Sequence, residues 1–314
     1  MAVLGSDKVP LPSETVSVIL NKVKEKSTIA ALSPAKPKKF VDESDMIFNP
    51  AAEAEVVTEG AQKAYYDNDI KTVKAARLTF QTTTRVSSQL KWTDEDNQLE
   101  IVSNIMQDQS EACARLIDYV LYHAINPLPK TTISGVTPLA TSAQQVAATG
   151  DPTADLDALL DAVIEEWEAN GIALSRGFAN ALRKVRVPAT GARLYPDINL
   201  SLDVSNLEGL SASVSNTVNG DARRTTKSGI LSFAGDFSVI RWGMVRDMTA
   251  EIIEFGDPDG QGDLKRNNQV AYRTEGVLGY AVLDASAIAC LKDSDGAYGF
   301  TGTGAKAAKS RKAA

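Results

Sequence analysis

Few side chains of this 314-residue sequence are of the types that carry out acid–base or metal chemistry. It holds one histidine, His123, and two cysteines, Cys113 and Cys290, which lie far apart. A Ser-His-Asp hydrolase needs a histidine beside its nucleophile, and a multi-histidine metal site needs several. Zinc sites and disulfide scaffolds need closely spaced or more numerous cysteines. None of these sites is expected, and His123 and Cys113, on a predicted apolar helix stripe, are expected to be packing residues.

A second candidate for chemistry is the acidic run from Asp257 to Asp263, DPDGQGD. It resembles the first half of a calcium-binding loop, but that pattern needs a glutamate at position twelve, where Asn268 stands. The flanking segments also read as strands. We therefore expect a flexible turn at the tip of a long hairpin and no metal site. No GxGxxG, GxxxxGK[ST] or GxSxG motif occurs, so no cofactor and no enzyme with a small-molecule pocket is expected.

The charge is unevenly distributed along the chain. The net charge is −7, but residues 301–314 hold four basic residues and no acidic one. Residues 21–39 hold six lysines and one glutamate. A net acidic charge argues against a protein that recognises nucleic-acid sequences. The two basic segments are interpreted as solvated arms, which either serve solubility alone or also contact another molecule.

No apolar N-terminal segment indicates a signal peptide, and the uncharged stretch 131–150 is too polar to span a membrane. We expect a soluble protein of a reducing compartment.

The elements that must position any site follow from the apolar periodicity. The clearest helix is predicted over 93–126, with Thr93 as its N-cap. A second helix is predicted from a Thr153 cap, followed by a strand at 172–174 and a third helix capped by Ser175. Strands at 239–255 and 268–283 are predicted to form a very long hairpin. The mixture predicts an α+β fold.

Two segments lack the apolar content for a core of their own. Residues 1–45 are interrupted by prolines and show no stable periodicity. Residues 50–90 read as a hairpin-like excursion whose second half is rich in β-branched residues. Projections of this kind are expected to be buried against other copies, which indicates a structural assembly subunit.

Six segments in a fixed order resemble the tailed-bacteriophage major capsid proteins, those with the phage HK-ninety-seven type capsid fold. They are AEVVTEGAQK at 54–63, the helix at 93–126, GVTPL at 135–139, ADLDALLDAVIEEWEANG at 154–171, GDFSVIRWGMVRDMTAEI at 235–252 and LKRNNQVAYRTEGVLGYAVLDASAI at 264–288. The resemblance covers roughly residues 28–300. No single motif decides it, and its strength lies in the order of the six.

The resemblance implies a division of the chain into the parts of that fold. The parts are an N-terminal arm at 1–45, an extended β-hairpin loop at 46–90, a peripheral domain at 91–130 and 233–280, an α/β axial domain at 131–232 and 281–300, and a basic C-terminal tail at 301–314. The peripheral domain would carry the long spine helix and the long β-hairpin. Only 53 residues precede Ala54. We expect no built-in scaffolding domain there, and either a separate scaffolding protein or a chain already in mature form.

The implied function is structural. Such subunits self-assemble as hexamers and pentamers into the icosahedral head that encloses the double-stranded DNA of a tailed phage, assembled in the host bacterial cytoplasm. Implied partners are other copies, a portal protein and, in some members, a decoration protein, with weak non-specific contact to packaged DNA. The family carries no catalytic pocket or cofactor. The alternative within the same fold is an encapsulin-type nanocompartment shell protein, against which the AEVVTEG and GDFS segments and the long arm argue. An enzyme with a composite interface site is the remaining alternative.

Some members of this family cross-link their subunits, which implies one set of site residues. A lysine of the extended loop joins an asparagine of a neighbour's peripheral domain, aided by a glutamate seven residues beyond the asparagine. Lys63, Asn268 and Glu275 stand at the matching positions. The reaction needs a neutral amine in an apolar site. Val57 and Met248 match that pocket, whereas Arg273 replaces an apolar residue and would keep Glu275 ionised. The competing interpretation is that Asn268 and Glu275 make interface hydrogen bonds and that Lys63 makes a surface salt bridge.

Overall fold

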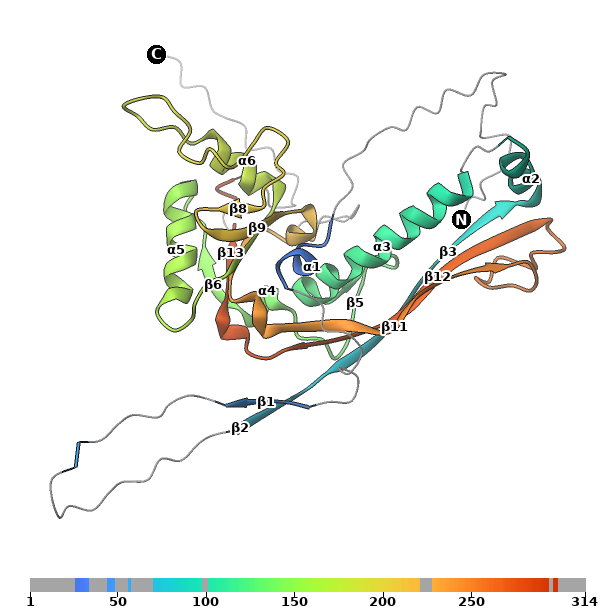
Figure 1. Ribbon diagram of the computed structural model, residues 1–314, viewed down its shortest axis with the longest axis horizontal. Coiled ribbons are helices and arrows are strands. Elements are labelled where there is room, and N and C mark those ends of the chain that lie inside the picture. The colour runs from blue at the N-terminus through green and yellow to red at the C-terminus, as the bar shows by residue number, and fades with distance from the viewer. Residues whose placement is uncertain are drawn as a thin grey trace. The chain divides into compact units, whose positions relative to one another are not determined.

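The computed structural model describes residues 26–33, 44–48, 56–57, 70–97, 101–220, 228–293 and 296–298. Its contacts divide the chain into two compact units, drawn in Figure 1. Unit 1 comprises Met1–Val16, Ala35–Ser110 and Val239–Asp284, and unit 2 comprises Ser17–Pro34, Glu111–Ser238 and Ala285–Ala314. The predicted C-terminal tail, most of the predicted arm, and residues 49–55 and 58–69 of the predicted extended loop lie outside the described residues.

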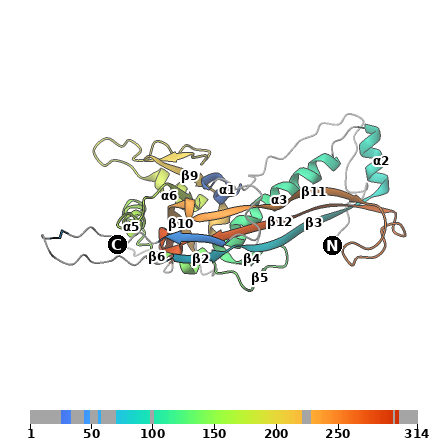
Figure 2. The same ribbon diagram turned by 60° about the horizontal axis from the view of Figure 1, so that its bottom comes forward.

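Unit 1 is built on a three-stranded antiparallel sheet in the order β11-β12-β3. The strands are β3 (Ala76–Ser87), β11 (Ile240–Ile253) and β12 (Gln269–Val282), and Figure 2 shows them side by side. The predicted hairpin of 239–255 with 268–283 is thereby confirmed. A second, two-stranded sheet pairs β1 (Ser44–Phe48) with β2 (Ile70–Lys74).

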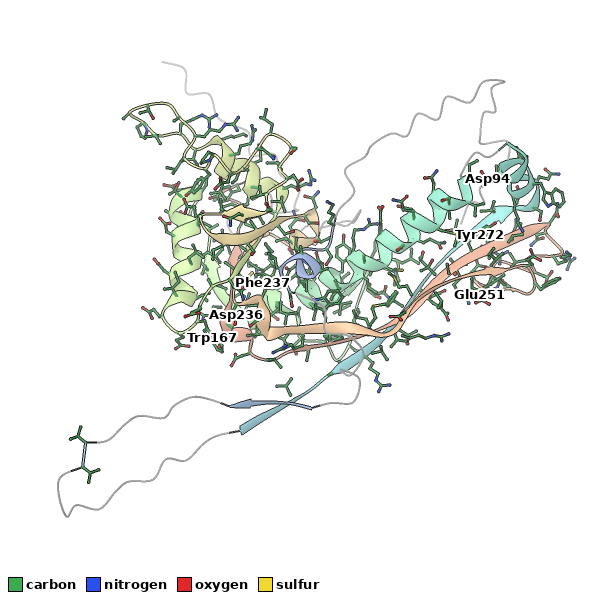
Figure 3. All side chains as sticks on the ribbon, in the orientation of Figure 1. Asp94, Trp167, Asp236, Phe237, Glu251 and Tyr272 are labelled. Atoms are coloured by element: carbon green, nitrogen blue, oxygen red, sulfur yellow. The ribbon has the colours of Figure 1, made fainter. Side chains whose placement is uncertain are left out.

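The long helix predicted over 93–126 is wrong in its first part. The structure has two helices, α2 (Ser88–Asn97) and α3 (Ile101–His123), and Thr93 lies inside α2. The carboxylate of Asp94 explains the break, because it accepts hydrogen bonds from the backbone N–H of Ile101 (2.8 Å) and of Val102 (3.1 Å). The first N–H groups of a helix have no carbonyl partner within it, and Asp94 supplies an acceptor for two of them at the start of α3. Figure 3 labels Asp94 in α2, facing the start of α3.

The core of unit 1 lies between α3 and one face of the sheet. The buried residues are Val86, Leu90, Val270 and Tyr272, against which Ile101, Val102, Ile105 and Met106 pack. One buried amide fixes this packing. Gln109 donates to the hydroxyl of Thr84 (2.8 Å) and to the carbonyl of Tyr272 (3.0 Å), and accepts from the hydroxyl of Thr274 (2.9 Å). Because this buried amide has all its hydrogen-bond partners in only one arrangement, it specifies how α3 packs on the sheet.

Unit 2 is built on a six-stranded mixed sheet in the order β6-β13-β10-β7-β9-β8. The strands are β6 (Gln144–Ala147), β7 (Gly171–Leu174), β8 (Asn206–Leu207), β9 (Leu210–Val214), β10 (Ile230–Gly235) and β13 (Ile288–Lys292). Strands β7 and β10 are buried at every position. Such near-continuous apolar strands are typical of a sheet covered on both faces.

Two helices and their caps complete the main core of unit 2. They are α5 (Pro152–Ile164) and α6 (Arg176–Lys184), which pack Leu159, Phe178 and Leu182 against the sheet. Ser175 caps α6 as predicted, by accepting from the N–H of Phe178. The predicted Thr153 cap of α5 is wrong, because Asp151 is the capping residue and accepts from the N–H of Thr153 (3.0 Å).

The remaining elements are short. They are α1 (Thr28–Leu32), α4 (Leu139–Ser142), β4 (Ile125–Asn126), β5 (Thr131–Thr132) and the 3-10 turns η2 (Asn216–Asn219), η3 (Phe237–Val239) and η4 (Ala285–Ala287). Within the described part of the chain, no helix combines the length and apolar character needed to cross a bilayer.

Candidate functional site

The asparagine of the predicted cross-linking set lies immediately before β12. Asn268 has φ of +52° and an exposed side chain. Its N–H donates to the carbonyl of Lys265 (3.2 Å), and its carbonyl accepts from the N–H of Ser88 (3.0 Å). The left-handed backbone conformation is one that asparagine tolerates better than most residues. Local backbone geometry is therefore a sufficient reason for asparagine here, besides any chemistry of its side chain.

The glutamate of the set lies in the middle of β12. Glu275 is paired with Thr249 of β11 and Gln81 of β3, and its carboxylate lies 3.8 Å from the Nη1 of Arg246. Arg273, predicted to act on Glu275, instead donates to the hydroxyl of Thr83 (3.1 Å) and the carbonyl of Pro258 (2.6 Å). The cation that contacts Glu275 is therefore Arg246, which the sequence pattern did not single out.

One copy of the chain does not bring the set together. An extended strand rises about 3.3 Å per residue, so Asn268 and Glu275 are separated by roughly 20 Å along β12. Lys63 lies outside the described residues. Met248, predicted to form part of the apolar pocket, is 41% exposed in β11. A cross-linking site would need residues from different copies, and the three residues stay a prediction.

The acidic loop between β11 and β12 forms the tip of the long hairpin, as predicted, and is organised by an internal cation. Its flexibility stays a prediction. The guanidinium of Arg85, in β3, is buried and donates to the carboxylates of Asp257 (2.9 Å) and Asp259, to the carbonyl of Gly262 (2.9 Å) and to the side-chain oxygen of Gln269 (3.2 Å). These hydrogen bonds raise the pKa of Arg85 and lower the pKa of Asp259. A planar five-donor fork suits such multiple recognition of carboxylates.

Arg85 engages the carboxylates of the calcium-like sequence, and the absence of a metal site there stays a prediction. The two carboxylates that would ligate a cation already face the guanidinium. Across the described ranges, no three His, Cys, Asp or Glu side chains cluster as metal ligands. Because the loop ends at Asn268, its fixed shape also fixes where that asparagine stands.

Among the described residues, the carboxylate with the most hydrogen bonds lies in unit 2. Asp118, on α3, is fully buried and accepts from the hydroxyls of Ser27 (2.6 Å) and Thr217 (2.5 Å) and from the N–H groups of Thr28 (2.8 Å) and Ile29 (3.2 Å). Burial raises its pKa, and these hydrogen bonds act in the opposite direction. The carboxylate thus holds the start of α1, a short piece of the predicted N-terminal arm, against α3 and η2. No local sequence pattern indicates these long-range contacts.

The only histidine is a packing residue, as predicted. His123 is buried at the end of α3, and its Nε2 lies 3.1 Å and 3.0 Å from the carbonyl oxygens of Thr217 and Val218. Two carbonyl acceptors assign the proton to Nε2. Burial lowers the pKa of His123 to about 4, although both hydrogen bonds favour the charged form.

This burial predicts an acid-sensitive step in unit 2. The folded state binds the His123 proton less readily than the unfolded state, where the pKa is about 6.5. Stability from this group is complete above pH 6.5 and falls as the pH drops toward 4, by about 3 kcal/mol in total. Urea unfolding at pH 7 and at pH 4.5 measures this loss of unfolding free energy. His123→Gln, which keeps an N–H donor but does not titrate, should lose about 2 kcal/mol less over this range. Equal losses in both proteins would refute this assignment.

The chain is similar in sequence and in fold to proteins from phages, and in fold to a protein from a capsid particle. The family model described as "Phage capsid family" matches residues 8–303. A structure from Mycobacterium phage Ogopogo is 32% identical, with a TM-score of 0.79, and the match covers 93% of this chain and 100% of the other. A structure from Gordonia phage Cozz is 27% identical, with a TM-score of 0.77, and covers 90% and 91% of the two chains. The structure titled "Capsid of empty GTA particle computed with C5 symmetry" is 15% identical, with a TM-score of 0.60, over 91% and 94%. No curated protein matches.

Proposed function

Because the chain belongs to the phage capsid family, we propose that it forms the hexamers and pentamers of an icosahedral head that encloses the double-stranded DNA of a tailed phage. The chain is a structural major capsid protein of the virion shell and has the phage HK-ninety-seven type capsid fold. The observation that carries the proposal is the family match over nearly the whole chain, together with the fold similarity to phage structures across both units.

Exposed apolar side chains in unit 1 support burial against other copies. The distal half of β11, an edge strand of the sheet, exposes Met248 (41%) and Ile252 (51%), and Phe255 follows at 67%. An isolated soluble domain rarely gathers such side chains along one edge strand. Contact with neighbouring subunits in the shell would remove them from water.

The proposal includes partners beyond other copies of the chain. They are a portal protein, a separate scaffolding protein, and in some cases a decoration protein, with assembly in the host bacterial cytoplasm. The acidic body suits weak, salt-screened contact with packaged DNA, because a genome held by many basic groups would not slide during filling and release. We propose no enzymatic turnover for this protein.

The content of the particles separates a phage head from an encapsulin-type compartment. Particles from a phage lysate are treated with nuclease, opened, and analysed for protected DNA. A phage head protects double-stranded DNA of genome length. Particles that hold only protein cargo would contradict the phage proposal and support the nanocompartment alternative.

A denaturing gel of mature particles tests the cross-linking residues. In the reaction, Nζ of Lys63 attacks Cγ of Asn268 to form an amide. Glu275 accepts the amine proton and returns it to the asparagine nitrogen, which leaves as ammonia. Glu275 is partly exposed and contacted by Arg246, which is a poor setting for deprotonating a lysine. We therefore expect a single band near 33.5 kDa. A ladder of covalent oligomers that disappears in Lys63→Arg would contradict this and establish the cross-link.

A further inference from the structure

Unit 2 holds a surface groove with an apolar floor and an acidic rim, which we call the α5 groove. Its lining residues are Leu156, Leu160, Ile164, Trp167, Glu168, Ala169, Ile172, Leu207, Glu208 and Leu210, around a hollow of about 510 Å³. Ile164 is 61% exposed, although it is a large aliphatic residue. Trp167, labelled in Figure 3, has a buried indole N–H with no acceptor among the described residues.

The same unit carries a projecting hairpin whose composition complements the α5 groove. Residues 186–193, which we call the 186–193 hairpin, connect α6 toward β8 and extend away from the sheet in Figures 1 and 2. Arg186 and Arg193 form a β-bridge at its base, and the N–H of Val187 donates to the carbonyl of Ala192 (2.9 Å). Its tip is the small, apolar sequence VPATGA. Because backbone hydrogen bonds already hold the hairpin in one shape, docking would cost little conformational entropy.

The α5 groove and the 186–193 hairpin carry opposite charges. The groove lining includes Glu168 and Glu208 and no basic residue, whereas the hairpin holds Arg186 and Arg193 and no acidic residue. Among the described residues, no salt bridge joins Glu168, Glu208, Arg186 or Arg193 to an opposite charge. Oppositely charged patches on two different surfaces of one subunit can pair with each other across a contact between two copies.

We propose that the 186–193 hairpin of one subunit docks into the α5 groove of the next, and this inference rests on the proposed assembly of the chain into rings. The small apolar tip would cover Ile164 and Trp167, and the two arginines would face Glu168 and Glu208. Because hairpin and groove are different surfaces, the contact is heterologous. Repeated head to tail, a heterologous contact forms a ring when its rotation closes, and such rings are what five- and six-membered capsomers require.

Charge reversal tests the pairing in the full-length protein. The variants R186E/R193E and E168K/E208K should each raise the protein concentration needed for particle assembly at least about tenfold, because like charges would meet. Combining all four substitutions should restore assembly to within about threefold of the unchanged chain. Because Glu168, Glu208 and Arg186 are exposed and Arg193 is only half-buried, the melting temperature should change little.

A matched control separates pairing from net charge. R186E/R193E combined with Glu165→Lys and Glu166→Lys has the net charge of the unchanged chain but not the proposed pairs, since Glu165 and Glu166 do not line the α5 groove. It should stay as defective as R186E/R193E. Rescue by this control, or normal assembly of either reversed pair, would overturn the pairing.

A disulfide test gives a geometric readout that does not depend on charge. Oxidised particles of Ala189→Cys/Ile164→Cys should show a ladder of covalent oligomers on a denaturing gel, whereas each single variant should show none. Absence of the ladder in assembled particles would overturn the inference and leave the proposed function intact. Failure of the unchanged chain to form particles would instead contradict the proposed function.

Discussion

Asp118→Ala is expected to lower the free energy of unfolding of unit 2 by about 3–5 kcal/mol, the largest effect of any single substitution considered. Removing one partner from a fully buried, hydrogen-bonded polar cluster leaves the other groups without partners in a dry site. Here the hydroxyls of Ser27 and Thr217 and the N–H groups of Thr28 and Ile29 would all lose their acceptor. Urea unfolding followed by circular dichroism measures the loss.

The local consequence is the release of the α1 segment. Amide hydrogen exchange at residues 28–32 should become much faster in Asp118→Ala, because the carboxylate that caps α1 is gone. Asp118→Asn should also be destabilising, since an amide turns a donor toward groups that are donors themselves. The matched control is Asp108→Ala, an exposed aspartate of the same helix, which should cost less than about 0.5 kcal/mol. A similar small loss for Asp118→Ala would contradict the role assigned to this carboxylate.

Arg85→Ala is expected to have the second largest effect, a loss of about 2–4 kcal/mol in unit 1. The substitution removes the cation that the carboxylates of Asp257 and Asp259 face. The loss is less than for a fully buried pair, because the side chain of Asp257 is 39% exposed and can regain water. Arg85→Lys should recover less than half of the unfolding free energy that Arg85→Ala loses, since an ammonium group cannot reproduce the planar hydrogen-bonding fork of a guanidinium.

Loss of Arg85 should change the loop more than the sheet. Exchange at residues 256–268 should rise strongly, whereas β3 and β12 stay protected by their ladder of backbone hydrogen bonds. The freed carboxylates and the carbonyl of Gly262 are oxygen ligands of the kind that calcium takes. Millimolar calcium should therefore partly restore the loop in Arg85→Ala and leave the unchanged chain unaffected. An ordered loop in Arg85→Ala without calcium would refute the internal-cation account.

Local patterns in the sequence predicted the elements whose signals are local. Alternation along 239–255 and 268–283 is a period-two signal, and both strands form where predicted. The apolar stripe after residue 100 likewise predicted α3, and Ser175 predicted the start of α6. The order of the six segments predicted the capsid fold, which the similarity to the Ogopogo phage structure confirms.

The features that the sequence did not predict include one interaction within a helical segment and several interactions between residues far apart in sequence. Asp94 lies in a polar run with Glu95 and Asp96, and the sequence pattern does not reveal that it caps a separate helix seven residues on. Arg85 and Asp257 are 172 positions apart, and only the register of β3 against β12 brings them together. Asp118 reads as an ordinary polar residue of a helix until η2 and α1 pack on it. Such contacts depend on topology, which no local window contains.

Electron microscopy of the expressed chain, alone and with a candidate scaffolding protein, tests the central claim most directly. The account predicts closed icosahedral shells whose reconstruction shows this fold arranged in rings of six and of five. A chain that stays monomeric under both conditions, or that forms only open filaments or amorphous aggregates, would contradict the claim that it is the repeating subunit of a phage head.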